Sequence, residues 1–403
     1  MPDTHTTLHL ESRLSSSSAC RPFKVERIAE SDLNDLLIAE WDALHCSISP
    51  STPFTTPRWN ILWWKHHRSN RLSVHDELCL LVVRDARNSL VAVAPMMFTR
   101  RPSVGPVRVN TLRFFGADPN VTELRGLVCR PDDEVDAFDA VRNYVSARLP
   151  PADWVEWGIL RRENWTEAVR KLPSGANASS HEIDGYHLEL PGTWEELRSS
   201  RSRNIKESIR RCYNSLRRDG FTPELRVVQS PQDTPEALAT FFRLHSLRSL
   251  AANTVVHPDV FRKANDRAFL TDYALEMSHA GQLRLFQLLI GGNVVATRLG
   301  FQFNDEIYLY YSGYDLTWSK YSVMTTLLVE AIKWAIDQRL KLVNLSTGTD
   351  VSKLRWSPIA THYCGLTEVQ PGRRANLSFS TYQHAQRFTR WLQRFRAAVI
   401  VRR

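Results

Sequence analysis

The stretch Glu306-Ile-Tyr-Leu-Tyr-Tyr-Ser-Gly-Tyr-Asp315 decides the fold that we expect for this chain. Its aromatic residues favour a β-strand over 306–312, and a tight turn and an apolar helix from about Ser322 follow that strand. The N–H groups that open a helix have no partner inside the helix, and they lie at the positive end of its dipole. A strand, a turn and a helix start in this order therefore predict a site that binds an anion such as a phosphate.

The elements around this stretch extend the pattern over the second half of the chain. A hairpin is expected from Leu283–Ile290, the turn Gly291-Gly292-Asn293 and Val294–Phe303. After the helix, which we expect to end near Arg339, a strand is expected over Lys341–Leu345. Upstream, apolar spacing predicts three helices and one strand: Ser202–Arg218, Pro235–Leu250 and Phe261–His279, with the strand Leu225–Gln229.

The first half has the same order of elements. It is expected to contain helices over 31–47 and 59–64, a hairpin of 77–84 and 90–99, a strand over 112–115, a helix over 132–149 and a strand over 154–160. We therefore expect an α/β (α+β) fold of two tandem lobes, each a mixed, mostly antiparallel sheet flanked by helices. The run 173–180 marks the boundary, giving lobes over 23–175 and 185–370 between a disordered leader (1–22) and a tail (371–403).

The composition fits a globular protein with an anionic partner. Of the 403 residues 43% are hydrophobic and 12 are tryptophans, which is enough for large cores. The formal charge of +9 favours phosphates, an anionic polymer, a lipid surface or nucleic acid, although it also serves solubility alone. Six scattered cysteines without a Cys-x-x-Cys pair predict neither a disulfide framework nor a metal site. Without a long apolar run or a signal peptide, we expect a cytoplasmic protein.

Several common catalytic motifs do not occur in the sequence. It contains no Gly-x-Gly-x-x-Gly, no phosphate loop ending in Gly-Lys-Ser/Thr, no Gly-x-Ser-x-Gly and no His-Glu-x-x-His. The sequence therefore speaks against a dinucleotide oxidoreductase, a nucleoside triphosphatase, a serine hydrolase and a metalloprotease.

A series of short motifs extends over residues 23–370. Among them are Pro53-Phe54, Phe114-Phe-Gly116, Arg201-Ser-Arg-Asn-Ile-Lys206, Phe241-Phe-Arg-Leu-His245, Tyr308-Leu-Tyr-Tyr-Ser-Gly-Tyr-Asp315 and Lys353-Leu-Arg-Trp356. In this order and spacing they resemble the GNAT-type acyltransferases grouped with the cellulose-biosynthesis acetyltransferases, which are related to the Fem-type peptidoglycan aminoacyltransferases. The resemblance implies two GNAT-like lobes, with the acyl-CoA site in the second lobe.

The resemblance also implies which residues hold acetyl-CoA or another acyl-CoA, used as a co-substrate. The strand 306–312 would separate from 341–345 to admit the pantetheine arm, although an aromatic strand also occurs without any ligand. The implied contacts are Tyr311, Ser312, Gly313, Tyr314, Lys320, Tyr321 and Ser322. Where the family commonly has Pro-Gly after Tyr-Ser, this chain has Val323-Met324, so it lacks the close backbone approach that glycine permits.

Three residues are candidates for the catalytic step. His245 follows two phenylalanines in an apolar helix and is either a general base or a hydrogen-bonded core residue. Asp315 either orients an acceptor or caps the turn after the strand. Asp350 either acts as the base or caps the short helix that contains Lys353.

Basic residues suggest where an anion or acceptor binds. Arg203, Lys206 and Arg210 form a stripe on helix 202–218 that is either an electropositive wall or a solvated face. Lys353 and Trp356 follow the strand 341–345 and are expected at the substrate site. The tail 371–403 has eight arginines and no acid, which predicts a basic amphipathic helix that either contacts a membrane surface or docks on the main body.

These observations lead us to expect an acyl-CoA-dependent acyltransferase in which an acceptor amine or hydroxyl attacks the thioester directly. A small-molecule or glycan-linked acceptor and a role in cellulose, exopolysaccharide or cell-envelope synthesis follow from the resemblance alone. Two alternatives remain open. One is a Fem-like transferase that uses aminoacyl-tRNA, and the other is a non-catalytic binding protein with a GNAT-like fold.

Overall fold

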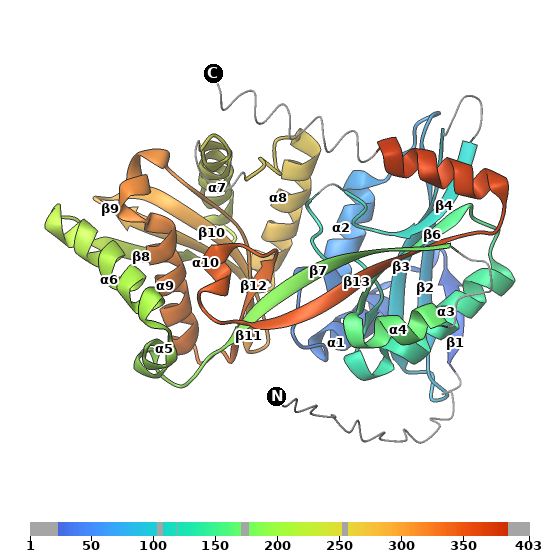
Figure 1. Cartoon of the computed structure of the whole chain (residues 1–403), viewed down its shortest axis with the longest axis horizontal. Coiled ribbons are helices and arrows are strands. Elements are labelled where there is room, and N and C mark those ends of the chain that lie inside the picture. Colours follow the sequence, from blue (N-terminus) through green and yellow to red (C-terminus); the bar gives the residue numbers. More distant parts are fainter. Residues whose placement is uncertain (1–22, 103–107, 119, 171–176, 252–256, 386–403) are drawn as a thin grey trace, which may run out of the picture.

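The computed structural model describes residues 23–102, 108–118, 120–170, 177–251 and 257–385. They form one mixed sheet in the order β1-β2-β3-β4-β6-β13-β7-β12-β11-β10-β9-β8, with helices on both faces. The expected α/β class, a mixed sheet flanked by helices, is confirmed (Figure 1). The two sheets that we expected are, however, continuous with each other.

The first lobe runs from β1 to α4. Its elements are β1 Lys24–Ile28, α1 Asp35–Cys46, α2 Pro57–His67, β2 His75–Arg84, β3 Leu90–Pro102, β4 Arg108–Phe114, β5 Val128–Cys129, α3 Glu134–Arg148, β6 Trp154–Arg161 and α4 Arg162–Arg170. β7, Asn177–Glu189, follows and leads to the second lobe.

The second lobe runs from α5 to α10. Its elements are α5 Trp194–Ser200, α6 Arg203–Arg218, β8 Pro223–Val228, α7 Thr234–Ser249, α8 Ala264–His279, β9 Leu283–Ile290, β10 Asn293–Phe303, β11 Glu306–Tyr314, the 3-10 helix η4 Leu316–Tyr321, α9 Val323–Asp337, β12 Leu342–Thr347 and α10 Val351–Leu354. The chain then returns through β13, Ile359–Val369.

The two lobes repeat one topology. Strands β1-β2-β3-β4-β6 of the first lobe correspond in order to β8-β9-β10-β11-β12 of the second, and in each lobe the last two strands are parallel. In each, a long helix connects that parallel pair, α3 in the first and α9 in the second. The topological repeat predicted from the order of elements is therefore confirmed.

The lobes exchange their final strands. β13, which follows the second lobe, lies between β6 and β7, while β7, which follows the first lobe, lies between β13 and β12. In Figure 1 both appear as long ribbons that cross from one lobe to the other. The run 173–180, which we took for a boundary, thus leads directly into a central strand, because the polar residues of 177–189 hide its β character. Chain position still separates the lobes, but their sheets are one.

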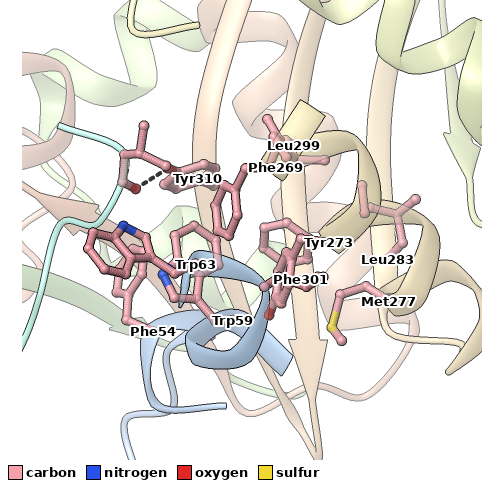
Figure 2. Packing of buried hydrophobic residues seen from close by; sticks show 14 of the residues in the cluster. Phe54, Trp59, Trp63, Phe269, Tyr273, Met277, Leu283, Leu299, Phe301 and Tyr310 are labelled. Atoms are coloured by element: carbon pink, nitrogen blue, oxygen red, sulfur yellow. Dashed lines mark hydrogen bonds between the residues drawn. The ribbon is translucent and has the colours of Figure 1, made fainter. Parts of the chain in front are cut away.

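An aromatic core joins the lobes on one face of the sheet. Trp59 of α2 packs edge-on against Phe269 and Tyr273 of α8, with ring centroids 4.9 and 4.8 Å apart. Figure 2 shows these rings next to Phe301 and Tyr310 of the sheet. The other face of the second lobe is covered by α6 and α9. The apolar stripe expected on α6 is buried there: Ile205, Ile209, Cys212 and Leu216.

The tail begins with a helix that docks on the first lobe. Residues 373–385 are helical, and Phe379 and Tyr382 lie against the indole of Trp154 with ring centroids 5.4 Å away in both cases. Arg101 lies over the Tyr382 ring. The start of the tail therefore docks on the main body, and the rest of the predicted amphipathic helix, residues 386–403, lies outside the described residues. Within the described part of the chain, no helix is long and apolar enough to cross a membrane.

Candidate functional site

The second lobe contains a parallel strand pair that is joined at one end only. β11 and β12 form just three residue pairs, the last of them Tyr308 with Asn344. β11 continues to Tyr314 and β12 to Thr347, so the two strands diverge beyond Tyr308. The divergence expected from the sequence is confirmed, and it leaves β11 without a strand partner on that side.

A β-bulge lies in β11 where the divergence begins. The register against β10 shifts between Arg298 and Gly300, so that Tyr310 and Tyr311 both lie opposite Leu299. The two tyrosine rings are 4.5 Å apart. One residue of a bulge is left out of the hydrogen-bonded ladder. The bulge therefore gives β11 a backbone group that the sheet does not use.

A loop of the first lobe, residues 115–127, brings a carboxylate to this place. Glu123 accepts a hydrogen bond from the hydroxyl of Tyr308, and it also receives Ser346 Oγ at 3.3 Å and Thr347 Oγ1 at 3.4 Å. Burial raises the pKa of Glu123 above its usual value of 4.5, although the Tyr308 hydrogen bond and the charge of Lys353 oppose the rise. Glu123 can therefore exchange a proton closer to neutral pH than a surface glutamate can.

Two more tyrosines of β11 hold the same loop. The hydroxyl of Tyr310 donates to the carbonyl of Val121, and that of Tyr311 donates to the carbonyl of Asn120 at 2.7 Å. Tyr311, which we expected at the acyl donor, thus already uses its hydroxyl on the first lobe. Three successive contacts of β11 fix the loop beside the divergence.

Asp118 stiffens the loop from within. Its carboxylate accepts the N–H groups of Val121 and Thr122, at 2.5 and 3.0 Å, and the hydroxyl of Thr122 at 2.9 Å. It also accepts the indole N–H of Trp63 at 2.8 Å, while Trp59 donates to the Thr122 hydroxyl at 3.2 Å. The loop that bears Glu123 is therefore anchored to α2 as well as to β11.

Lys353 of α10 contacts the same residues that contact Glu123. Its ammonium donates to the carbonyl of Thr347 at 2.5 Å and to Ser346 Oγ at 3.3 Å. Burial lowers the pKa of Lys353 to about 8, although the Glu123 carboxylate opposes the change. Lys353, which we predicted at the substrate site, thus lies beside Glu123, Ser346 and Thr347. It loses its positive charge at a pH where most lysines still keep theirs.

Arg248 of α7 adds a second cation. Its guanidinium donates to Ser312 Oγ at 2.7 Å and to His257 Nε2 at 2.7 Å. Burial and the charge of Arg248 lower the pKa of His257 to about 4, so the imidazole is neutral at pH 7. Ser312, predicted at the cofactor, is therefore bonded to an arginine that the sequence did not single out.

His245 is a hydrogen-bonded core residue, which is one of the two roles that the sequence left open. Its Nδ1 donates to the carbonyl of Ser312 at 3.1 Å, and its Nε2 accepts the N–H of Val260 at 3.3 Å. Burial lowers the pKa of His245, which keeps the ring neutral. Since both ring nitrogens are used, no lone pair is left to take a proton from a substrate.

Both aspartates proposed for catalysis cap short helices. Asp315 accepts the N–H of Thr317 at 3.0 Å at the start of η4, and Asp350 accepts the N–H of Ser352 at 2.8 Å at the start of α10. Burial acts to raise the pKa of Asp350, but the Ser352 hydrogen bonds and nearby cations lower it overall. Asp350 therefore lies ionised near His257 and Lys353, and Asp315 lies apart in a turn.

The expected tight turn after β11 is replaced by η4. Ser322 connects η4 to α9 with left-handed backbone, φ 54°, and its carbonyl accepts the N–H of Thr325 at 2.8 Å. The guanidinium of Arg355 reaches this helix start, donating to Thr325 Oγ1 at 3.4 Å and to Ser208 Oγ at 3.2 Å. A cation thus lies at the N-terminus of α9, the place where the sequence predicts an anion.

The other residues predicted for the cofactor lie around the same junction. Lys320 is 3.7 Å from the carboxylate of Asp219, which also accepts the hydroxyl of Tyr321 at 2.8 Å. Tyr314 is half-buried against the α9 side of the sheet. Gly313 faces the other side, where it touches α7.

The basic stripe of α6 lies at the surface, and Trp356 lies in the core. Arg203 and Arg210 are exposed, and Lys206 donates to the carbonyl of Ser199 at 2.7 Å. The indole of Trp356 is 1% exposed and packs among apolar residues. The structure therefore separates Trp356 and the stripe from the group around Glu123.

Sequence reasoning missed Glu123, Arg248 and Arg298. Glu123 comes from the other lobe, and nothing in its local sequence indicates that it contacts β11 and β12. Arg298 did leave a signal, because it is the only charged residue in the apolar strand Asn293–Phe303. A lone arginine in a buried strand indicates a partner that the strand itself does not supply.

Residues 203–354 match the family model described as an acetyltransferase (GNAT) domain. The match begins with α6 and ends with α10, so it includes the diverging strands and Lys353 but not Glu123. No curated protein matches the chain. Among solved structures, the crystal structure of FemX is similar over 85% of this chain and 96% of that chain, with 10% identity and a TM-score of 0.53. That likeness concerns the fold.

Two further structures overlay less closely. The C-terminal domain of a putative lysylphosphatidylglycerol synthetase from Agrobacterium fabrum covers 86% of this chain and 96% of its own, at 12% identity and a TM-score of 0.45. A tandem GNAT protein from the clavulanic acid biosynthesis pathway covers 87% of this chain and 100% of its own, at 9% identity and a TM-score of 0.40.

Proposed function

We propose, on the premise that residues 203–354 form a GNAT-type acetyltransferase domain, that this chain is an acyltransferase. It would transfer an acyl group from coenzyme A to an amine or hydroxyl where β11 and β12 diverge. The observation that carries the proposal is the pairing of these strands, which ends at Tyr308, with the half-buried carboxylate of Glu123 bonded to Tyr308 of β11 and to Thr347 of β12.

The residues around the divergence suit an acyl-CoA substrate. The edge of β11 beyond Tyr308 has no strand partner on that side, and Arg355 supplies a cation at the start of α9. Val323, which stands where the family commonly has proline, is 1% exposed and packs into the core, so its side chain points away from an approaching phosphate. A bound acyl-CoA would supply an activated thioester carbonyl.

Glu123 would serve as the general base. Its pKa is raised by burial, so the carboxylate is a stronger base than a surface glutamate and can accept the proton that the acceptor loses as it attacks. The hydroxyl of Tyr308 fixes the orientation of the carboxylate. The backbone group freed by the bulge at Tyr310 and Tyr311 would donate to the oxygen on which negative charge develops. No covalent bond to the protein is needed.

Glu123→Gln tests this mechanism. The amide keeps the size of the carboxylate, and its carbonyl oxygen can still accept the Tyr308 hydroxyl, but it cannot take a proton, so kcat should fall by about 10²- to 10⁴-fold. The measurement is thiol release from acetyl-CoA in the presence of a pool of amines and amino sugars. Coenzyme A should still raise the melting temperature of the variant, because its binding does not need the base.

The matched control is Glu224→Gln, which makes the same change at an exposed position of β8 and should leave the rate unchanged. Unchanged turnover in Glu123→Gln would remove Glu123 from the mechanism. A wild-type protein that no coenzyme A species stabilises, even at millimolar concentration, would refute the acyl-CoA proposal itself.

Transfer from an aminoacyl-tRNA is the second candidate. The observation that favours it is the exposed basic face of α6, which includes Arg203, Arg211 and Arg217. An RNA bound there would dissociate steeply with rising salt, because binding releases counterions. Filter binding of tRNA between 50 and 200 mM salt distinguishes the two donors, about a thousandfold loss being expected for six or more phosphate contacts. The cytoplasmic location, the membrane contact and the envelope pathway stay predictions.

A further inference from the structure

Arg298 is a partly buried cation without a hydrogen-bond or ion-pair partner among the described residues. It lies in β10 between Thr297 and Leu299, both of which are fully buried. Its Nε atom is inaccessible and has no hydrogen-bond acceptor, and no described carboxylate pairs with its guanidinium. Burial lowers the pKa of Arg298 to about 10, so the side chain still carries its charge at pH 7. A buried charge that is left unpaired is strongly unfavourable.

Other cations lie next to Arg298. It forms a cross-strand pair with Ser312, so the two side chains leave the sheet on the same face. The hydroxyl of that serine accepts the guanidinium of Arg248 at 2.7 Å, which places two arginines around one hydroxyl group. Lys353 and Asp350 lie within electrostatic reach of both arginines.

The charges of this group do not balance. It has three cations, Arg248, Arg298 and Lys353, against two carboxylates, Glu123 and Asp350, and His257 is neutral. No ion pair within 4.0 Å joins these cations to these carboxylates in the part of the chain that the structure describes. One further negative charge would neutralise the group and give Arg298 the acceptor that it lacks.

We propose that Arg248, Arg298 and Lys353 bind a carboxylate of the substrate. The proposal rests on the proposed function and deepens it, because it defines which class of substrate the site selects. A carboxylate is favoured over a phosphate monoester for two reasons. It carries the single charge that balances the group, and its two oxygens match the planar fork of a guanidinium.

The carboxylate can belong to either substrate. A dicarboxylic acyl group such as succinyl would carry it on the thioester, and an amino acid would carry it on the acceptor. Calorimetric titration separates the sources. In one arm the probes are succinyl-CoA and acetyl-CoA. In the other arm the probes are succinate and its uncharged analogue succinamide, added to protein saturated with coenzyme A.

The variants are Arg298→Gln, which removes the charge, and Arg298→Lys, which keeps the charge but not the fork. Arg226→Gln is the matched control, because Arg226 bonds to Gln287 at the far edge of the sheet. We expect the wild-type protein to prefer the carboxylate probe about tenfold or more in one arm. Arg298→Gln should lose the preference, Arg298→Lys should keep part of it, and Arg226→Gln should keep it all.

Equal binding of charged and uncharged probes by the wild-type protein in both arms would overturn the proposal. So would a preference that survives in Arg298→Gln. If Arg298→Gln does not fold, which its melting curve shows, Arg298→Lys decides: a preference weaker than that of the wild-type protein supports the proposal, and an undiminished preference overturns it. Binding of coenzyme A alone is measured in every variant, so a wild-type protein that binds coenzyme A but shows no carboxylate preference contradicts this inference and leaves the acyltransferase proposal standing.

Discussion

Gly313 lies where β11 touches α7, and this contact leaves no room for a side chain. A Cβ atom there would lie 2.3 Å from the backbone nitrogen of His245 and 2.4 Å from the carbonyl carbon of Leu244. The sequence predicted Gly313 at the cofactor, and its resemblance-derived role stays a prediction. The structure gives a separate reason why glycine occupies this position. Without a side chain there, α7 can approach closely enough for His245 and Arg248 to reach Ser312.

Gly313→Ala should therefore destabilise the protein. The obstructing atoms belong to the backbone of α7, so helix and strand must separate, at a cost of about 1–3 kcal/mol in the free energy of unfolding. Denaturant titration followed by tryptophan fluorescence measures it. Gly185→Ala is the control, because a Cβ at that strand glycine meets its nearest atom at an ordinary 3.4 Å. Equal stability of the two variants would show that the α7 contact yields easily.

Two shifted pKa values predict how activity depends on pH. Glu123 must be ionised to act as a base, and burial raises its pKa above 4.5, so activity should rise with pH through that elevated pKa. Lys353 must be charged to hold an anion, and its pKa is about 8, so activity should fall above that pH. A kcat/KM profile tests both limbs. A flat profile from pH 5 to 9 would exclude both groups.

The loop 115–127 is the element that connects the lobes chemically. Its described residues form no helix or strand, yet hydrogen bonds from Asp118, two indoles and three tyrosine hydroxyls hold it in place. In the first lobe the same loop closes the equivalent divergence, because Gly126 bridges to Ile159 and the N–H of Ile159 donates to the carbonyl of Arg125 at 2.9 Å. The loop thus fills one pair of diverging strands and brings Glu123 to the other.

Asp118→Ala should misplace Glu123 without touching a substrate. It removes four hydrogen bonds that shape the loop, and a displacement of about 1 Å at a catalytic group can lower the rate by up to about 100-fold. Steady-state kinetics should show the loss in kcat, with coenzyme A binding retained. Asp85→Ala removes a similar loop carboxylate from the β2–β3 turn and should leave the rate unchanged. Equal rates for both variants would argue against positioning by Asp118.

Helices and strands whose own apolar residues recur at a regular spacing were predicted from the sequence. Elements whose structure depends on distant parts of the chain were not. α6 and α9 carry apolar stripes that no other structure could bury, so the sequence indicates them directly. β7 was missed, because its own residues are polar and its place in the sheet is set by the two strands on either side of it, which come from later parts of the chain. The site divides in the same way. Lys353 belongs to a sequence motif and could be predicted. The role of Glu123 depends on its contacts with residues of the second lobe, which the sequence does not reveal.

The molecule should unfold as one unit. β6 pairs along its length with β13, and β7 pairs with both β13 and β12, so neither sheet is complete without a strand from the other lobe. Residues 23–190 expressed alone should show no cooperative unfolding transition, since the edge of β6 would be unpaired. The full chain should show a single transition, with tryptophan fluorescence and circular dichroism coinciding. A sharp transition in the 23–190 fragment would contradict the prediction.

The strand exchange also determines when the protein can fold during its synthesis. β13 emerges from the ribosome about 200 residues after β6, which at about 5–20 residues per second means a delay of roughly 10–40 seconds. Throughout that delay the nascent first lobe exposes the apolar edge beside Trp154 and Leu160, a template for pairing with other chains. Faster translation across the second lobe should therefore shorten this exposure and raise the yield of native protein.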